Sequence, residues 1–192
     1  MEDASEQINL RRRRFIAAAT VGTLAYQVGG IEMRLTPAQA RAQGASLSVL
    51  SATEARALES LGDCLGPGAR VAGIAHYVDA NLRRPAAESL LMLRYLDVLP
   101  PHSEFYQHGL SALDAASVRQ HGTVFAGLSE DIATSFVAAI ALANPDGWQG
   151  APAPLFYFAT RGDAVDIVYG TKAGFEKLNV PYLAHIEPKT DF

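Results

Sequence analysis

Helical periodicity is the feature that most constrains how this 192-residue chain can fold. Ser51-Ala52-Thr53-Glu54 has the form of a capping box, and Leu50 stands before it as a hydrophobic staple. The apolar residues that follow recur at the three- and four-residue spacing of an amphipathic helix: Ala55, Leu58, Leu61 and Leu65. Gly66-Pro67-Gly68 then ends this first helix.

The same period continues to about residue 168, while alternating strand patterns are almost absent and no internal repeat is visible. The predicted helical segments are 51–65, 69–82, 89–99, 103–119, 129–144 and 154–168. We expect their apolar stripes to face a common core: Val71, Ile74, Tyr77 or Val78, Leu82, Phe105, Leu110, Leu113, Val118, Ile132, Phe136, Val137, Ile140, Leu155, Phe156, Phe158 or Ala159, Val165 and Val168. We therefore predict an all-α fold, a single domain of about six helices spanning residues 43–168.

The N-terminus carries a basic run that leads into an apolar segment. Arg12-Arg13, one spacer residue and then Phe15-Ile16 form the pattern of a twin-arginine export signal. The apolar segment 15–28 is shorter than the about 18 to 20 residues that a membrane-spanning helix needs. This pattern predicts export of the folded chain across a bacterial inner membrane, to the periplasmic side.

Two small-residue motifs are candidate cleavage sites, Ala38-Gln39-Ala40 and Ala40-Arg41-Ala42, so we assign residues 1–42 to the signal segment. The alternatives are a basic arm that binds nucleic acid or anionic lipid, and a signal that is kept as a membrane anchor. Without residues 1–42, roughly 150 residues remain, enough for one domain with its own core.

Charge argues against a nucleic-acid partner. Residues 1–42 hold six of the sixteen basic residues and four of the twenty acidic ones, so the remainder has ten basic and sixteen acidic residues. Its formal charge is therefore near −6. Proteins that bind nucleic acid depend on basic contacts with phosphate, which a domain of this charge does not favour.

The sequence shows no recognisable catalytic, cofactor-binding or metal-binding motif. It contains neither a Gly-x-Gly-x-x-Gly turn after a strand, as dinucleotide-binding proteins have, nor a Cys-x-x-Cys-His haem site. His102 and His108 lie six residues apart and face different sides of a helix, and His121 is interpreted as a helix-end residue. His76 is expected to line the core or an interface. We assign no catalytic, cofactor-binding or metal-binding residue to this chain.

Cys64 is the single cysteine, so no disulfide can form within the chain. It is either a small buried apolar residue of the first helix or a residue that bonds to a partner subunit.

Residues 169–192 form an apparently irregular tail that is unusually rich in large apolar residues. We expect it to pack on the domain or on a partner, because such residues are rarely left in water. The candidate partner interface consists of aromatic anchors, turn residues and one histidine: Tyr169, Gly170, Gly174, Phe175, Pro181, Tyr182 and His185. The alternative is that these aromatics seal the end of the helical domain.

Four stretches of the sequence, within residues 47–188, resemble the gluconate 2-dehydrogenase subunit 3 family. They are Leu50–Ala55, Gly66–Ala69 before Ile74–Asp79, Phe105–Asp114, and Asp166–Gly170 with Gly174-Phe175. The family's usual ending has a Tyr-Gly-Gly-type turn, then Gly-Trp and Gly-Tyr-Pro. This chain has Tyr169-Gly170-Thr171, Gly174-Phe175 and Pro181-Tyr182, which indicates a divergent branch.

The resemblance implies a non-catalytic subunit of a membrane-associated dehydrogenase complex at the periplasmic face of the inner membrane. In such a complex a large subunit of the glucose-methanol-choline oxidoreductase type holds FAD, and a multihaem cytochrome c accepts the electrons. The small subunit would carry the signal to the twin-arginine export machinery and stabilise the large one. The alternative is an independent periplasmic enzyme or metal-binding protein that is exported folded.

Overall fold

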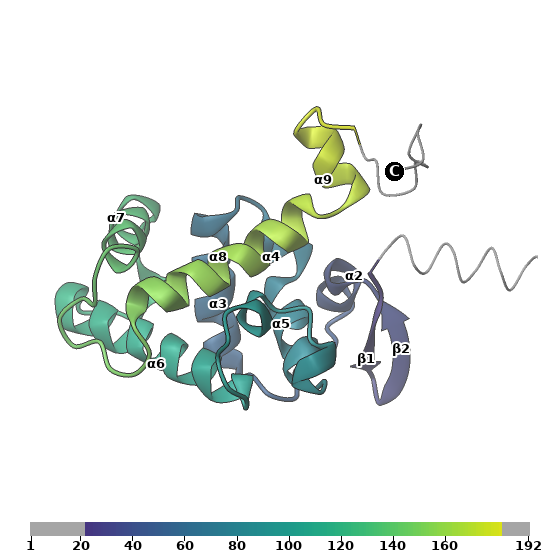
Figure 1. Ribbon diagram of the computed structural model, residues 1–192, viewed down its shortest axis with the longest axis horizontal. Helices are drawn as coiled ribbons and strands as arrows, with labels where there is room; N and C mark the ends of the chain where they lie inside the picture. The colour runs from purple at the N-terminus through teal and green to yellow at the C-terminus, as the bar shows by residue number, and fades with distance from the viewer. Residues whose placement is uncertain (1–21, 182–192) are drawn as a thin grey trace, which may run out of the picture.

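The computed structural model describes residues 22–181, and it confirms the prediction of an all-α fold with one addition, a two-stranded hairpin (Figure 1). The helices of these residues are α2 Pro37–Ala42, α3 Ala52–Leu65, α4 Ala69–Ala72, α5 Ile74–Leu82, α6 His102–His121, α7 Glu130–Ile140, α8 Ala153–Tyr169 and α9 Lys172–Lys177. The strands are β1 Leu24–Val28 and β2 Ile31–Leu35, which pair antiparallel.

Helix α3 begins as the sequence predicts and lies against α5, α6, α7 and α8. Both bonds of its capping box form: the Glu54 backbone N–H donates to Ser51 Oγ over 3.3 Å, and the Ser51 N–H donates to Glu54 Oε2 over 2.7 Å. Leu58 and Leu61 are fully buried. The apolar stripe read from the sequence is therefore the face that α3 turns toward the core.

Residues 69–82 do not form the single helix that we predicted. Gly73 adopts φ +86°, a left-handed conformation that L side chains disfavour, and it separates α4 from α5. The Pro37 carbonyl lies where a Cβ on Gly73 would stand. The chain bends there because α2 packs into the bend.

The leucine-rich segment 89–99 is also not an α-helix. It contains the short 3-10 helix Met92–Tyr95, and another, Ala86–Glu88, precedes it. Two of its backbone N–H groups donate to side chains of other helices: Leu90 to Asn81 Oδ1 and Met92 to Asp163 Oδ1. Polar side chains on α5 and α8 thus hold this loop.

Helices α6 and α8 cross at close range in the core (Figure 1). Gly109 allows this approach, because a Cβ on it would overlap the ring of Phe156. Along α8 the buried face includes Thr160 and Asp163 as well as apolar residues.

Four residues that we expected in the core are exposed: Val71, Val118, Ile132 and Val165. At the position left open between Phe158 and Ala159, Ala159 is the buried one.

The hairpin and α2 form a unit that we call the N-terminal clasp, residues 24–45, beside α5 (Figure 1). Gly29 and Gly30 both have positive φ, as a tight two-residue hairpin turn requires. The clasp contributes buried residues to a second, smaller core: Tyr26, Leu35, Ala40 and Ala45, with Ala80 of α5. Most of the clasp, residues 24–42, falls within the segment 1–42 that we assigned to the export signal. The residues of the predicted signal motif, Arg12, Arg13, Phe15 and Ile16, lie outside the described residues.

Candidate functional site

The predicted interface begins where α8 ends, and residues 172–177 are the short helix α9 and not irregular chain. Thr171 caps this helix, because its Oγ1 accepts from the Gly174 N–H over 3.0 Å. At the other end Asn179 has φ 53°, and the N–H groups of Asn179 and Val180 donate to the carbonyls of Glu176 and Phe175. This is a Schellman motif, in which asparagine occupies the left-handed position.

The two glycines of the predicted interface serve close packing, not the unusual backbone turns that we expected. Gly170 has φ −71°, an ordinary value, and a Cβ on it would overlap the Asp166 carbonyl. A Cβ on the buried Gly174 would overlap the backbone of Val168 and Tyr169. Glycine therefore allows α9 to fold back against the end of α8.

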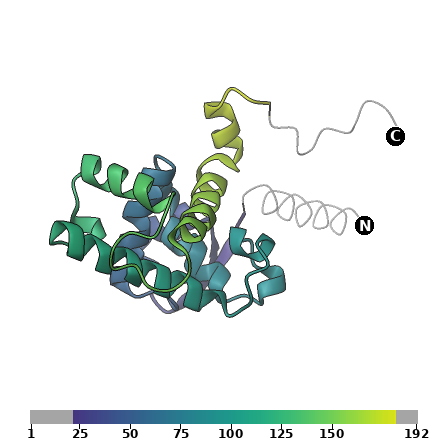
Figure 2. The same ribbon diagram turned by 60° about the vertical axis from the view of Figure 1, so that its left-hand side comes forward.

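The aromatic residues of this region are partly covered by the helical body. Tyr169 is half-buried and packs against the core, and Phe175 is half-buried in α9. Leu178, Val180 and Pro181 are exposed beyond them. In both views α9 stands at the end of α8, away from the other helices (Figure 2). Tyr182 and His185, also predicted for the interface, lie outside the described residues.

A second exposed apolar region, which the sequence analysis did not single out, lies in the loop between α5 and α6. Tyr95 is 65% exposed and Leu99 is 85% exposed. The Arg94 guanidinium lies 5.5 Å from the Tyr95 ring centroid, a distance at which a cation attracts an aromatic face. No periodic pattern could have marked this loop. Its backbone is held by Asn81 and Asp163, which lie on other helices.

Asp163 is the most strongly perturbed carboxyl of the described residues, and its partners are structural. Tyr106 Oη donates to one carboxyl oxygen, and the Met92 N–H donates to the other over 2.8 Å. Burial raises the pKa of Asp163 to about 7, and it raises the pKa of Tyr106 well above its ordinary value. The pair is enclosed in the core, where it ties α6 and α8 to the loop.

Asp79 is a second buried carboxylate with a structural task. Its side chain accepts hydrogen bonds from three successive backbone N–H groups, those of Ser48, Val49 and Leu50, over 2.8 to 3.1 Å. Arg83 Nε lies 3.9 Å from Oδ2. This arrangement fixes the chain just before α3. In the sequence Asp79 falls on an apolar helix, so only its polarity could have drawn attention to it.

The histidines of the described residues do not converge on one place. His76 lines the small core beside the clasp, which confirms that expectation. His102 is buried with Nε2 3.1 Å from the Val98 carbonyl oxygen, whereas His108 and His121 are exposed. Within residues 22–181, no three His, Cys, Asp or Glu side chains are grouped so that they could hold a metal ion.

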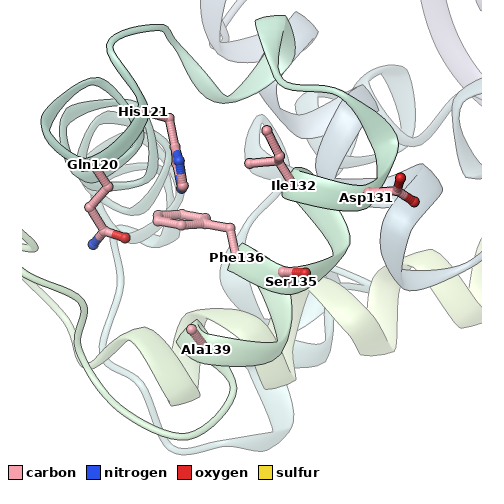
Figure 3. Close-up of a pocket in the computed structure, with 7 residues that line it drawn as sticks. All are labelled: Gln120, His121, Asp131, Ile132, Ser135, Phe136 and Ala139. Atoms are coloured by element: carbon pink, nitrogen blue, oxygen red, sulfur yellow. The ribbon is translucent and has the colours of Figure 1, made fainter.

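An open hollow of about 350 Å³ lies between the end of α6 and α7 (Figure 3). The His121 ring meets the Phe136 ring edge-on with centroids 5.7 Å apart, and Asp131 and Ser135 stand at the rim. In the part of the chain that the structure describes, no hydrogen bond joins His121 to Asp131 or Ser135. The hollow therefore lacks the nucleophile–base contact from which hydrolytic sites are built.

Cys64 is half-buried near the end of α3 and packs against the core. Burial, with a further contribution from the negative charge of Asp63, raises the pKa of its thiol. A raised pKa keeps the group as a thiol and lowers its reactivity.

The described residues thus define a class: a small helical module whose buried polar side chains hold its own loops. Among these residues no helix combines the length and apolar character needed to cross a membrane. The chain belongs to the gluconate 2-dehydrogenase subunit 3 family, whose family model matches residues 52–185. The match covers α3 to α9 and begins after the clasp. No curated protein and no solved structure matches the chain.

Proposed function

We propose that the protein is a non-catalytic accessory subunit of a membrane-associated, flavin-dependent dehydrogenase that acts on gluconate, another sugar or an alcohol. The observation that carries this proposal is the family match over residues 52–185, which takes in the whole helical body. The family is named for one subunit of a multi-subunit dehydrogenase, so partner subunits are implied.

The buried carboxyl groups support a structural role for this chain. Asp79 and Asp163 each accept hydrogen bonds from backbone N–H groups of loops. Buried acids engaged in this way hold the fold and are not free to exchange protons with a substrate. The proposal therefore assigns the chemistry to a large glucose-methanol-choline-type subunit that contains FAD, with electrons passing to a multihaem cytochrome c.

The N-terminal sequence supplies the second part of the proposal. Arg12-Arg13 with Phe15-Ile16 would direct the folded chain to the twin-arginine export machinery. The chain would carry the FAD-bearing subunit with it and remain beside it at the periplasmic face of the inner membrane.

The end of α8 with α9 is the surface that we assign to the large subunit. Leu178 and Val180 are exposed on a helix end that stands clear of the body (Figure 2). Apolar and aromatic residues are the usual anchors where two subunits meet. The half-buried Tyr169 and Phe175 beside them would complete such a patch.

Affinity purification of the tagged chain from its own host tests the proposal. We expect a flavoprotein to elute in equal amount, with the absorbance of flavin and of haem c in the same fraction. A lone chain that carries its own chromophore or bound metal would instead identify an independent periplasmic protein.

Two matched pairs of variants separate export from docking. The double variant Arg12→Lys with Arg13→Lys should leave both chains in the cytoplasm, whereas Arg34→Lys, in β2, should not. Val180→Asp should reduce the recovered flavoprotein about tenfold, as loss of an interface anchor does. Leu142→Asp is the control, because Leu142 is also apolar and exposed but lies beyond the end of α7.

A further inference from the structure

The N-terminal clasp, residues 24–45, is built into the domain and not merely laid on it. Tyr26 is 2% exposed, and Ala40, which both candidate cleavage sites share, is 0% exposed. Leu35 and Ala45 share their core with Ala80 of α5. Burial on this scale is typical of permanent structure and not of a segment awaiting removal.

Hydrogen bonds hold the clasp to α5 from two directions. Tyr26 Oη donates to the His76 carbonyl oxygen over 3.3 Å. The His76 ring reaches back to the clasp, with Nε2 3.1 Å from the Ala45 carbonyl oxygen. Because a carbonyl oxygen can only accept, Nε2 carries the proton of this bond. One residue of α5 therefore binds both the first strand and the last residue of the clasp.

Charged side chains of the body add two further ties. Arg83 Nη2 donates to the Ala25 carbonyl oxygen over 2.8 Å, which occupies a backbone group of β1. Arg41 Nε lies 2.9 Å from Glu59 Oε1, joining α2 to α3. The bend at Gly73 makes room for Pro37. The body thus presents several groups that contact the clasp.

Cleavage at either candidate site would remove the contacts that the hairpin and Pro37 make with the body. A peptidase acts on exposed, extended backbone, whereas Ala40 is buried inside α2 and Ala42 is its last residue. A cut after Ala40 or Ala42 would also take away Tyr26 and Leu35 and leave their apolar contact surface on α5 in water.

We propose that the clasp stays in the mature protein, so that any cleavage of the export signal falls before Leu24. The signal's apolar segment then ends near Thr23, where the folded hairpin begins, and is not continued through Val28. This inference rests on the proposed export of the chain, and it limits signal cleavage to the residues before Leu24.

The first residue of the exported protein shows whether the clasp is kept or removed. The full chain, tagged at its C-terminus, is recovered from the periplasm and membranes of its host, and its intact mass is measured. We expect a first residue at or before Leu24. A chain that begins at Arg41 or Gln43 overturns the inference.

Two exposed alanines provide a control for the same measurement. Ala38→Asp and Ala42→Asp would each block a peptidase that reads small residues at these sites, and neither side chain is buried. We expect the mass to change only by the substitutions themselves. Retention of a segment that the unaltered chain loses would show that these sites are used.

Limited digestion of the purified full chain by trypsin tests the docking without any need for export. The tryptic sites within the clasp are Arg34 and Arg41. We expect Tyr26→Ala to release the clasp and to speed cleavage there at least tenfold. Tyr95→Ala, which removes an exposed tyrosine, should leave the rate unchanged.

The two failures can be told apart. If the chain never leaves the cytoplasm, the proposed export is wrong, yet protection from trypsin still supports the docked clasp. If Arg34 and Arg41 are cut as fast in the unaltered chain as in Tyr26→Ala, the clasp is not docked and the inference fails, whatever the compartment.

Discussion

The N-terminal clasp precedes the helical body in the sequence and α9 follows it, and the body holds these two segments in different ways. The clasp shares a buried core with α5 and is tied to it through Tyr26, His76 and Arg83. Helix α9 rests on the end of α8, with Leu178 and Val180 exposed beside it. Apolar sequence at the two termini therefore has two uses. At one end it completes the fold, and at the other it is exposed on the surface that we propose for a partner.

The body that separates these two ends should be the part most sensitive to substitution. Gly109→Ala places a methyl group against the Phe156 ring at the α6–α8 crossing. We expect a loss of about 3 kcal/mol in the free energy of unfolding, the upper range for overpacking a core. Urea titration measures this loss. Ser111→Ala, on the exposed face of the same helix, should change stability by less than about 0.5 kcal/mol.

The second largest effect on stability is expected at the bend between α4 and α5, where the body contacts the clasp. Gly73→Ala combines an unfavourable positive φ with a clash against the Pro37 carbonyl, so we expect a loss of about 2 kcal/mol. Gly68→Ala is the matched control, because Gly68 has φ +94° but open space around it. It should cost about 1 kcal/mol. Equal losses in urea titrations of the two variants would mean that α2 does not press on the bend.

The pH dependence of stability tests the buried carboxyl that joins α8 to the loop. The pKa of Asp163 is raised by burial from 3.8 to about 7, so the folded chain binds more protons than the unfolded chain between these values. Its contribution to stability is therefore full below about pH 4 and is lost as the pH rises toward 7.

Asp163→Asn removes this ionisable group. We expect the free energy of unfolding to fall about 1 to 2 kcal/mol less between pH 4 and about pH 5.5 than in the unaltered protein. Thermal melts across this range measure the slope. Asp146→Asn, at an exposed ion pair with Arg119, should keep the original slope, and an unchanged slope in Asp163→Asn would contradict the assignment.

The smallest effect on stability should be found at α9. Leu178→Ser replaces a side chain that is 53% exposed, so we expect a change within about 0.5 kcal/mol by thermal melting. The same variant should lower the amount of co-purified flavoprotein. A large loss of stability with unchanged co-purification would show that α9 belongs to the core, as the clasp does.

Local signals in the sequence predicted much of the helical body. The capping box at Ser51 and the spacing of Leu58 and Leu61 depend on residues a few positions apart, so they were visible in the chain itself. The leucines of segment 89–99 were misleading, because Asn81 and Asp163 satisfy backbone N–H groups there from other helices. Val118 and Val165 were placed in the core wrongly, since apolar character does not fix which face of a helix meets a neighbour.

The predicted interface was only partly open to sequence reasoning. Its aromatic residues were evident, but the role of Gly174 depends on how closely α9 returns to α8. The exposed Tyr95 and Leu99 gave no signal, because they follow from the loop's attachment to distant side chains.

By itself, the sequence determined that the chain is helical, where the long helices α3, α6 and α8 begin and end to within two residues, and which family it resembles. These properties follow from caps, periodicity and short motifs, all of which act over a few residues. The tertiary structure alone decided that residues 24–45 belong to the folded domain. Their apolar residues fit an export signal or a core equally well. Only the contacts that His76, Arg83 and Gly73 make with the clasp show that these residues are part of a core.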